Sequence, residues 1–159
     1  MSNFCITDNA SAAYEEDFHE WTQQQSRFLK EEKWGCLDIP NLVEEIESLG
    51  RQEQRELENR LGVLLGHLLK WEFQPDKQAK SWRATIREQR RRIQRLLKRS
   101  PSLQPYLPQA LEEAYQDGLD LAIRETSLDE EDFPSECPYS LEQVLSSVFL
   151  PGEGVDYLQ

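Results

Sequence analysis

Apolar residues recur every three or four positions along most of the chain, a spacing typical of α-helices. This pattern predicts a first helix from about Tyr14 to Lys33, with Gly35 just beyond its last turn. A second, longer helix is predicted after Asp38, a residue type that favours the N-cap position. One apolar stripe would run along it, through Leu42, Ile46, Leu49, Leu57, Leu61, Leu64, Leu68 and Trp71.

Two further helices are predicted in the second half of the chain. The third would run from about Asp76 or Ser81 to Arg99, with a narrow apolar stripe. Its members are Trp82, Ile86, Ile93, Leu96 and Leu97. The fourth would follow Pro101 and could be broken at Pro105 or Pro108, because proline disrupts the helix interior.

The remaining C-terminal part combines an irregular connection with one short helix. Residues 127–139 hold a run of acidic residues and two prolines. Ser140 and Gln143 then have the spacing of a capping box, which predicts the start of a short helix. No segment alternates apolar and polar residues as a half-buried strand does. We therefore expect an all-α helical bundle with four main helices and a short C-terminal helix.

Length and composition fit one soluble domain. The chain has 159 residues, of which 38% are hydrophobic and 30% charged. We expect a flexible N-terminal tail over 1–11, a single helical domain over 12–151 and a C-terminal tail over 152–159. No apolar run approaches the ~18 residues of a membrane-spanning helix, so no membrane association is expected. The first ten residues lack the basic start and apolar stretch of a secretory signal.

The cysteines indicate a cellular compartment. There are three of them, Cys5, Cys36 and Cys137, and they are widely spaced. An odd number at irregular spacing favours free thiols over a disulfide framework or a zinc site. This predicts a cytoplasmic location and no metal or other cofactor.

Charge is strongly segregated along the chain. The segment 76–99 contains ten basic residues and two acidic ones, a charge of +8. Because the whole chain carries −12, the remainder carries −20. The basic helix could contact a phosphate backbone through Arg87, Arg91, Arg95 and Lys98. The alternative is that acidic residues of the same chain neutralise it, and we expect this second arrangement.

The corner between the second and third predicted helices is a candidate ligand site. An antiparallel hairpin would bring together two indoles, an imidazole and several cations, which could bind an anionic or aromatic ligand. These residues are His67, Lys70, Trp71, Trp82 and Arg83. The alternative is that the two tryptophans simply close one end of the core, and this is the more common role of such residues.

Glu53 is unusual because it falls on the apolar stripe between Leu49 and Leu57. A carboxylate in that position needs a partner, so we expect a buried ion pair with an arginine of the 83–95 stretch. A metal centre in a helical bundle would use a Glu-x-x-His pair, but Leu64 stands three positions before His67. No catalytic residue and no metal ligand is therefore assigned.

Several motifs together give the chain a family resemblance. It resembles the bacterial family known as "domain of unknown function 29" over about residues 14–151. The resemblance implies a small, cytoplasmic, all-helical protein and no defined activity. The motifs are Tyr14-x-x-Asp17-Phe18-x-x-Trp21, Leu42-x-x-Glu45-Ile46-Glu47-Ser48-x-Gly50, His67-Leu68-Leu69-Lys70-Trp71, Ser81-Trp82-x-x-Thr85-Ile86-x-Glu88-Gln89-Arg90, Ser100-Pro101-Ser102-Leu103 and Phe133-Pro134-x-x-Cys137-Pro138-Tyr139.

From the sequence we expect a non-enzymatic helical module that binds a protein partner or a second copy of itself. A regulator that binds nucleic acid through the basic helix 76–99 is the first alternative. An enzyme with a small-ligand or metal site near His67, Trp71 and Trp82 is the second.

Overall fold

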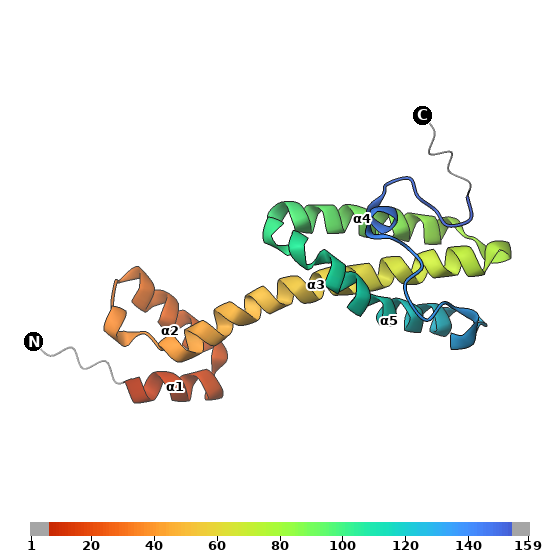
Figure 1. Cartoon of the computed structure of the whole chain (residues 1–159). Helices are drawn as coiled ribbons and strands as arrows, with labels where there is room; N and C mark the ends of the chain where they lie inside the picture. The colour runs from red at the N-terminus through yellow and green to blue at the C-terminus, as the bar shows by residue number, and fades with distance from the viewer. Residues whose placement is uncertain (1–6, 154–159) are drawn as a thin grey trace, which may run out of the picture. The chain divides into compact units, whose positions relative to one another are not determined.

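The computed structural model describes residues 7–153, and all regular secondary structure within them is helical. This confirms the all-α bundle. Short 3₁₀ turns connect several of the helices. Across the described residues, none of the helices is both long and apolar enough to span a bilayer. The α-helices in Figure 1 are α1 (Thr7–Glu16), α2 (Phe18–Lys30), α3 (Ile39–Phe73), α4 (Lys80–Arg99), α5 (Leu107–Glu125) and α6 (Leu141–Leu145).

The chain packs into two compact units. Unit 1 comprises Met1–Gln52 and unit 2 comprises Glu53–Gln159. Helix α3 contributes its first part to unit 1 and its remainder to unit 2. Whether both belong to one cooperative domain, as the sequence predicts for 12–151, stays a prediction that unfolding experiments can test.

The N-terminal helices differ from the sequence prediction. Helix α1 begins at Thr7, inside the predicted flexible tail; residues 1–6 lie outside the described part. A single helix from Tyr14 to Lys33 is also wrong, because Asp17 separates α1 from α2. Its carboxylate accepts the backbone N–H of Glu20 at 3.0 Å and so caps α2. A short acidic side chain can offer backbone donors this alternative to a continuous helix.

Unit 1 is held together by one buried indole and a set of polar contacts. Trp21 is buried, and its Nε1 donates to Asp38 Oδ2 at 3.0 Å. The backbone N–H of Asp38 donates to Gln25 Oε1 at 2.8 Å. The Tyr14 hydroxyl donates to Glu45 Oε1 at 2.6 Å, and this carboxylate raises the pKa of Tyr14 to about 12. These bonds tie α1 and α2 to the beginning of α3.

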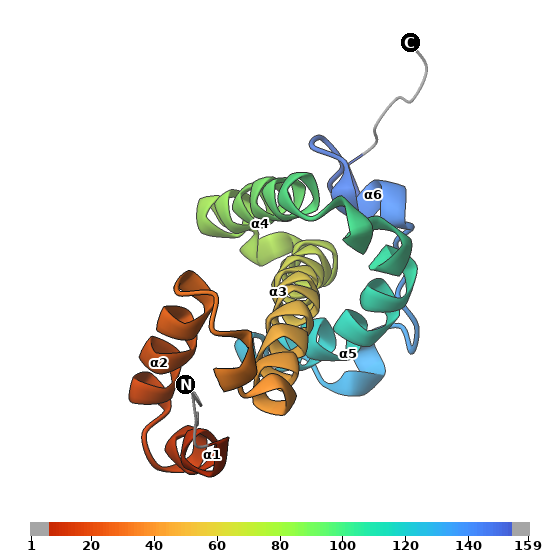
Figure 2. The same cartoon turned by 90° about the vertical axis from the view of Figure 1, so that its left-hand side faces the viewer.

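Unit 2 has a continuous apolar core. Figure 2 shows α4 and α5 packed on different sides of α3. The sequence pattern predicts one contact cluster of Leu61, Leu64, Leu68, Trp71, Trp82, Ile86 and Ile93. This is confirmed: six of its members are buried in one core, and Trp82 packs against it partly buried. The six are Leu61, Leu64, Leu68, Trp71, Ile86 and Ile93. The predicted capping box also forms, with the Ser140 side chain accepting the N–H of Gln143 and the Gln143 side chain accepting that of Ser140.

Glycines allow α3 and α5 to approach closely. A Cβ on Gly118 would lie 2.8 Å from Leu65 Cβ, and one on Gly66 would lie 3.0 Å from the Gly118 carbonyl oxygen. Gly62 faces the same helix, with 3.1 Å between its virtual Cβ and Asp117 Cβ. A glycine that interrupts an apolar helix stripe can mark a kink or a close helix contact, and at Gly62 the structure has the contact. At Gly50, by contrast, nothing lies within 4 Å of a virtual Cβ.

The cysteines only partly match the expectation of free thiols. Cys137 is free, and burial raises the pKa of its thiol. Cys36 is disulfide-bonded, so the prediction is wrong there. Cys5 lies outside the described residues. The inference of a reducing compartment therefore loses part of its support.

Candidate functional site

The basic side chains of α4 form a solvent-facing row. Six of them are exposed and recur every three or four residues, so they share one face of the helix. This face extends for about 27 Å at 1.5 Å per residue. The opposite face carries Ile86, Ile93 and Leu96 into the core. We call the exposed side chains the basic row: Lys80, Arg83, Arg87, Arg91, Arg95 and Lys98.

Within residues 7–153, no acidic side chain forms an ion pair with this row. Between residues 7 and 153, the ion pairs of α4 involve only Arg92, with Glu88 at 2.7 Å, and Arg99. Arg90, which lies outside the row, donates to carbonyl oxygens of α6. Internal neutralisation by ion pairs is therefore the wrong expectation for the basic row, as far as residues 7–153 are concerned.

Glu53 has a basic partner, as predicted, but the partner and the surroundings differ. Its carboxylate lies 2.7 Å from Arg99 Nη2, beyond the 83–95 stretch, and accepts the Ser100 hydroxyl at 2.9 Å. These two donors, Ser100 first, lower the pKa of Glu53. The Glu53 side chain is 34% exposed and that of Arg99 is 60% exposed, so the pair is not buried. This surface ion pair joins α3 to the C-terminal end of α4.

The predicted corner site contains a structural cation. Lys70 is buried, and its Nζ lies 2.6 Å from Glu125 Oε2 and 4.4 Å from the centroid of the Trp82 ring. The ion pair lowers the pKa of Glu125, with the Lys70 hydrogen bond as the main cause. A carboxylate and an indole face thus already surround the Lys70 charge, which leaves little of it for an added ligand.

The other corner residues are divided between the core and the surface. His67 is half-buried and its Nδ1–H donates to the Val63 carbonyl at 2.9 Å; burial lowers its pKa. Trp71 is buried in the core, with no hydrogen-bond partner for its Nε1. Arg83 is exposed and belongs to the basic row. No group of three metal-binding side chains occurs in the described part of the chain.

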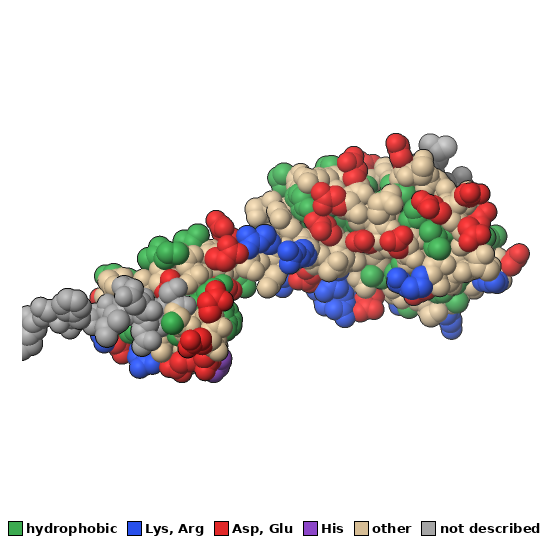
Figure 3. All heavy atoms as spheres, turned by 90° about the horizontal axis from the view of Figure 1, so that it is seen from below, with side chains coloured by type: hydrophobic (Ala, Val, Ile, Leu, Met, Phe, Trp, Pro, Cys, Tyr) green, Lys and Arg blue, Asp and Glu red, His purple; other side chains and the backbone are tan. Residues whose placement is uncertain are grey.

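Unit 1 displays an apolar surface that includes Ile46 and Leu49, two residues of the stripe predicted from the sequence. Figure 3 shows hydrophobic side chains gathered on this unit. Four of them lie on the first part of α3 and define what we call the apolar stripe: Ile39, Val43, Ile46 and Leu49, with exposed fractions of 48–66%. They span about 120° of the helix circumference, the width with which a helix ordinarily faces a core. Trp34, Phe18 and Leu29 are further exposed hydrophobic side chains of unit 1.

A family model described as "Domain of unknown function DUF29" matches residues 13–150. The chain belongs to the DUF29 family. The match covers most of both units and confirms the family suggested by the sequence motifs. No curated protein and no solved structure matches the chain.

Two features of this DUF29 chain could not be found by reading the sequence. Ile46 and Leu49 continue the same stripe as Leu57 and Leu61, so periodicity alone predicts equal burial for all four. Val148 and Leu150 approach the basic helix only through the course of the chain after α6. The charge segregation, however, was a correct signal that α4 carries a cationic surface.

Proposed function

We propose that this DUF29 chain is a non-enzymatic protein-interaction module whose binding surface is the apolar stripe of α3 in unit 1. The observation that carries the proposal is the exposure of Ile46 and Leu49, at 66% and 62%. Side chains of this size with regular helical spacing are ordinarily covered. A contiguous apolar surface on a water-exposed protein marks an interaction site.

The spacing of the stripe favours an amphipathic helix as the bound element. Ile39, Val43, Ile46 and Leu49 follow one another at intervals of four and three residues. Helices that dock on one another use anchors at these same intervals. The partner would place its own apolar residues between those of the stripe.

Charge favours a different protein over a second copy as the partner. Residues 12–52 contain ten acidic and four basic residues, a charge of −6. Two such units would repel each other, whereas a helix with basic flanks would be attracted. A cytoplasmic location stays a prediction.

Peptide binding to the purified full chain tests the proposal. The probe is a labelled 18-residue amphipathic peptide with a leucine stripe and lysine flanks; its comparison peptide has glutamate in place of lysine. We expect the lysine peptide to bind at least about tenfold more tightly. Binding should be lost in Ile46→Asp/Leu49→Asp and retained in Gln52→Asp/Gln54→Asp, which adds the same two charges beyond the stripe. Equal binding by both variants, or no binding of either peptide to the wild type, would refute the proposal.

A further inference from the structure

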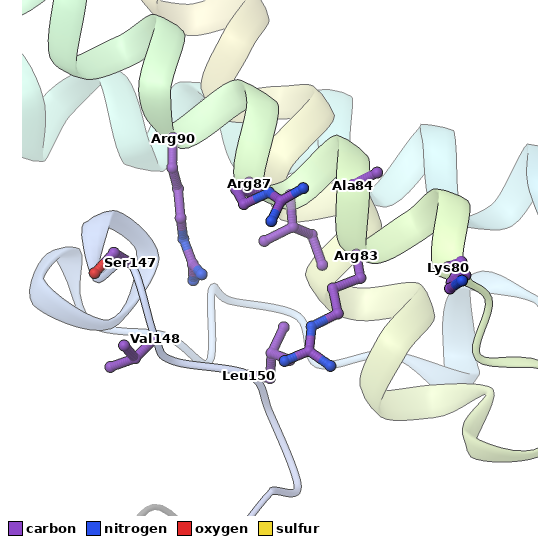
Figure 4. Close-up of a pocket in the computed structure, with 9 residues that line it drawn as sticks. Lys80, Arg83, Ala84, Arg87, Arg90, Ser147, Val148 and Leu150 are labelled. Atoms are coloured by element: carbon purple, nitrogen blue, oxygen red, sulfur yellow. The ribbon is translucent and has the colours of Figure 1, made fainter.

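The side of α4 nearest α6 contains a hollow of about 440 Å³ that is independent of the proposed surface on unit 1. Its cationic wall consists of Lys80, Arg83, Arg87 and Arg90. Its apolar wall consists of Ala84 and Ile86 from the same helix and of Val148 and Leu150 from the segment after α6. Figure 4 shows Arg83 and Arg90 projecting from α4 toward this segment. No acidic side chain is among the residues that line the hollow.

Arg90 has a structural role in this arrangement. It is 4% exposed, and its Nε donates to the Val144 carbonyl at 2.9 Å while Nη2 donates to that of Gln143 at 3.2 Å. Both carbonyls belong to α6, so the guanidinium satisfies the C-terminal end of that helix, where a cation is favourable. Arg90 thereby holds the segment with Val148 and Leu150 beside α4 and builds the second wall of the hollow.

The remaining cations of the hollow are available to a ligand. Lys80, Arg83 and Arg87 are exposed, and none forms an ion pair with any residue from 7 to 153. They lie on successive turns, so three charges border the hollow over about 10 Å of helix. Guanidinium groups bind carboxylates in a bidentate manner, which adds geometric selectivity to the charge attraction.

The apolar wall indicates what the anionic ligand carries besides its charge. Val148 is 69% exposed at the edge of the hollow, and Leu150 is buried at its base. An aliphatic group in this position would cover Val148 and gain from the removal of apolar surface from water. A phosphodiester backbone has no such group, and no aromatic side chain lines the hollow on which a base could stack.

From these contacts we infer that the hollow between α4 and the segment after α6 binds an acidic peptide segment of a partner protein, one that inserts an aliphatic side chain against Val148 and Leu150. The carboxylates of the segment pair with Lys80, Arg83 and Arg87. Arg91, Arg95 and Lys98 lie farther along the helix and add only long-range attraction. The segment therefore recognises one end of the basic row.

Two charge-matched triple variants of the full chain test this inference. The first is Lys80→Gln/Arg83→Gln/Arg87→Gln, which removes the cations of the hollow. The second is Arg91→Gln/Arg95→Gln/Lys98→Gln, which removes three equally exposed cations outside it. Circular dichroism is recorded first, and both variants should retain the helix content of the wild type. Fluorescence anisotropy at about 0.15 M salt then measures binding under physiological screening.

Three labelled probes are used: a 12-residue peptide of Asp, Glu and Leu, the same peptide with Ser in place of Leu, and a 12-base-pair DNA duplex. We expect the first triple variant to weaken leucine-peptide binding at least about tenfold and the second less than about threefold. Val148→Ser should weaken the leucine peptide and leave the serine peptide unchanged. Equal losses in the two triple variants, tighter binding of the duplex than of the leucine peptide, or no binding of that peptide would each overturn the inference.

Discussion

The two units of this chain use apolar side chains in opposite ways. Of the 24 buried hydrophobic residues among those described, Trp21 alone belongs to unit 1. Of the eight large hydrophobic side chains that are exposed within the described part of the chain, Val148 alone belongs to unit 2. Along one face of helix α3, the apolar side chains are exposed up to Leu49 and buried from Leu57 onward, with Glu53 on the stripe between them. Periodicity therefore identifies an apolar helix face, whereas only packing shows what covers it.

The largest expected difference between the units concerns core truncation. Leu64 is fully buried in unit 2, so Leu64→Ala should lower the free energy of unfolding by about 2–5 kcal/mol. Ile46 is 66% exposed in unit 1, so Ile46→Ala should change it by less than about 0.5 kcal/mol. Urea denaturation followed by circular dichroism measures both. Similar losses of unfolding free energy in the two variants would show that the apolar stripe is covered in the free protein, which would contradict the difference between the units.

Replacing a glycine by alanine should have opposite effects on the free energy of unfolding in the two units. Gly118→Ala places a methyl group 2.8 Å from Leu65 Cβ, so we expect a loss of about 1–3 kcal/mol in the free energy of unfolding. Gly50→Ala meets open space in a helix and should stabilise it by about 0.5–1 kcal/mol. Thermal melts of the two variants check the signs. A destabilised Gly50→Ala would mean that this face of α3 is packed.

Ion pairs provide a third contrast. Glu125→Ala removes the carboxylate beside buried Lys70 and should destabilise unit 2 by about 1–3 kcal/mol, because a desolvated cation loses its partner. In unit 1, Glu44 pairs with Arg51 at 2.7 Å, and both side chains are more than 40% exposed. Glu44→Ala should therefore change stability by less than about 0.5 kcal/mol. Urea midpoints compare the two. If the Glu125 variant is as stable as the wild type, the Lys70 charge must be solvated.

The smallest expected effect is a pH dependence in unit 2. Burial lowers the pKa of His67 below its ordinary value of 6.5, so the unfolded chain binds a proton more readily than the folded one. The resulting stability is present above pH 6.5 and is lost as the pH falls below it. His67→Gln should reduce the slope of the free energy of unfolding between pH 7.5 and 5.5. His19→Gln, on the exposed surface of unit 1, is the control and should keep the wild-type slope. A steeper slope in His67→Gln would contradict this assignment.

Local sequence signals predicted much of unit 2. The register of Leu61, Leu64 and Leu68 was correct because all three are buried in the core that α3 shares with residues of α4 and α5. The capping box at Ser140 was correct because capping depends only on neighbouring residues. The interruption of the first helix at Asp17 was missed, because the apolar pattern passes through it unchanged.

The candidate surfaces were predicted less well, for a physical reason. The positive charge of α4 can be counted from the sequence. Which way its basic side chains point depends on which face of the helix packs into the core, and in the structure the basic row faces solvent. The partner of Glu53 is Arg99 because the C-terminal end of α4 meets the middle of α3 there, a relation that no local pattern contains. The hollow beside Arg90 depends on a hydrogen bond between residues 54 positions apart.

Hydrogen exchange along α3 compares the two units within one helix, because α3 contributes residues to both. We predict strong protection of the amides from Leu57 to Trp71, close to that of global unfolding, and much faster exchange from Leu42 to Gln52, where apolar packing is sparse. Adding the lysine-flanked amphipathic peptide should slow exchange in the second segment only. Uniform protection along the whole helix in the free protein, with no change on adding the peptide, would contradict the account of unit 1 as an uncovered binding surface.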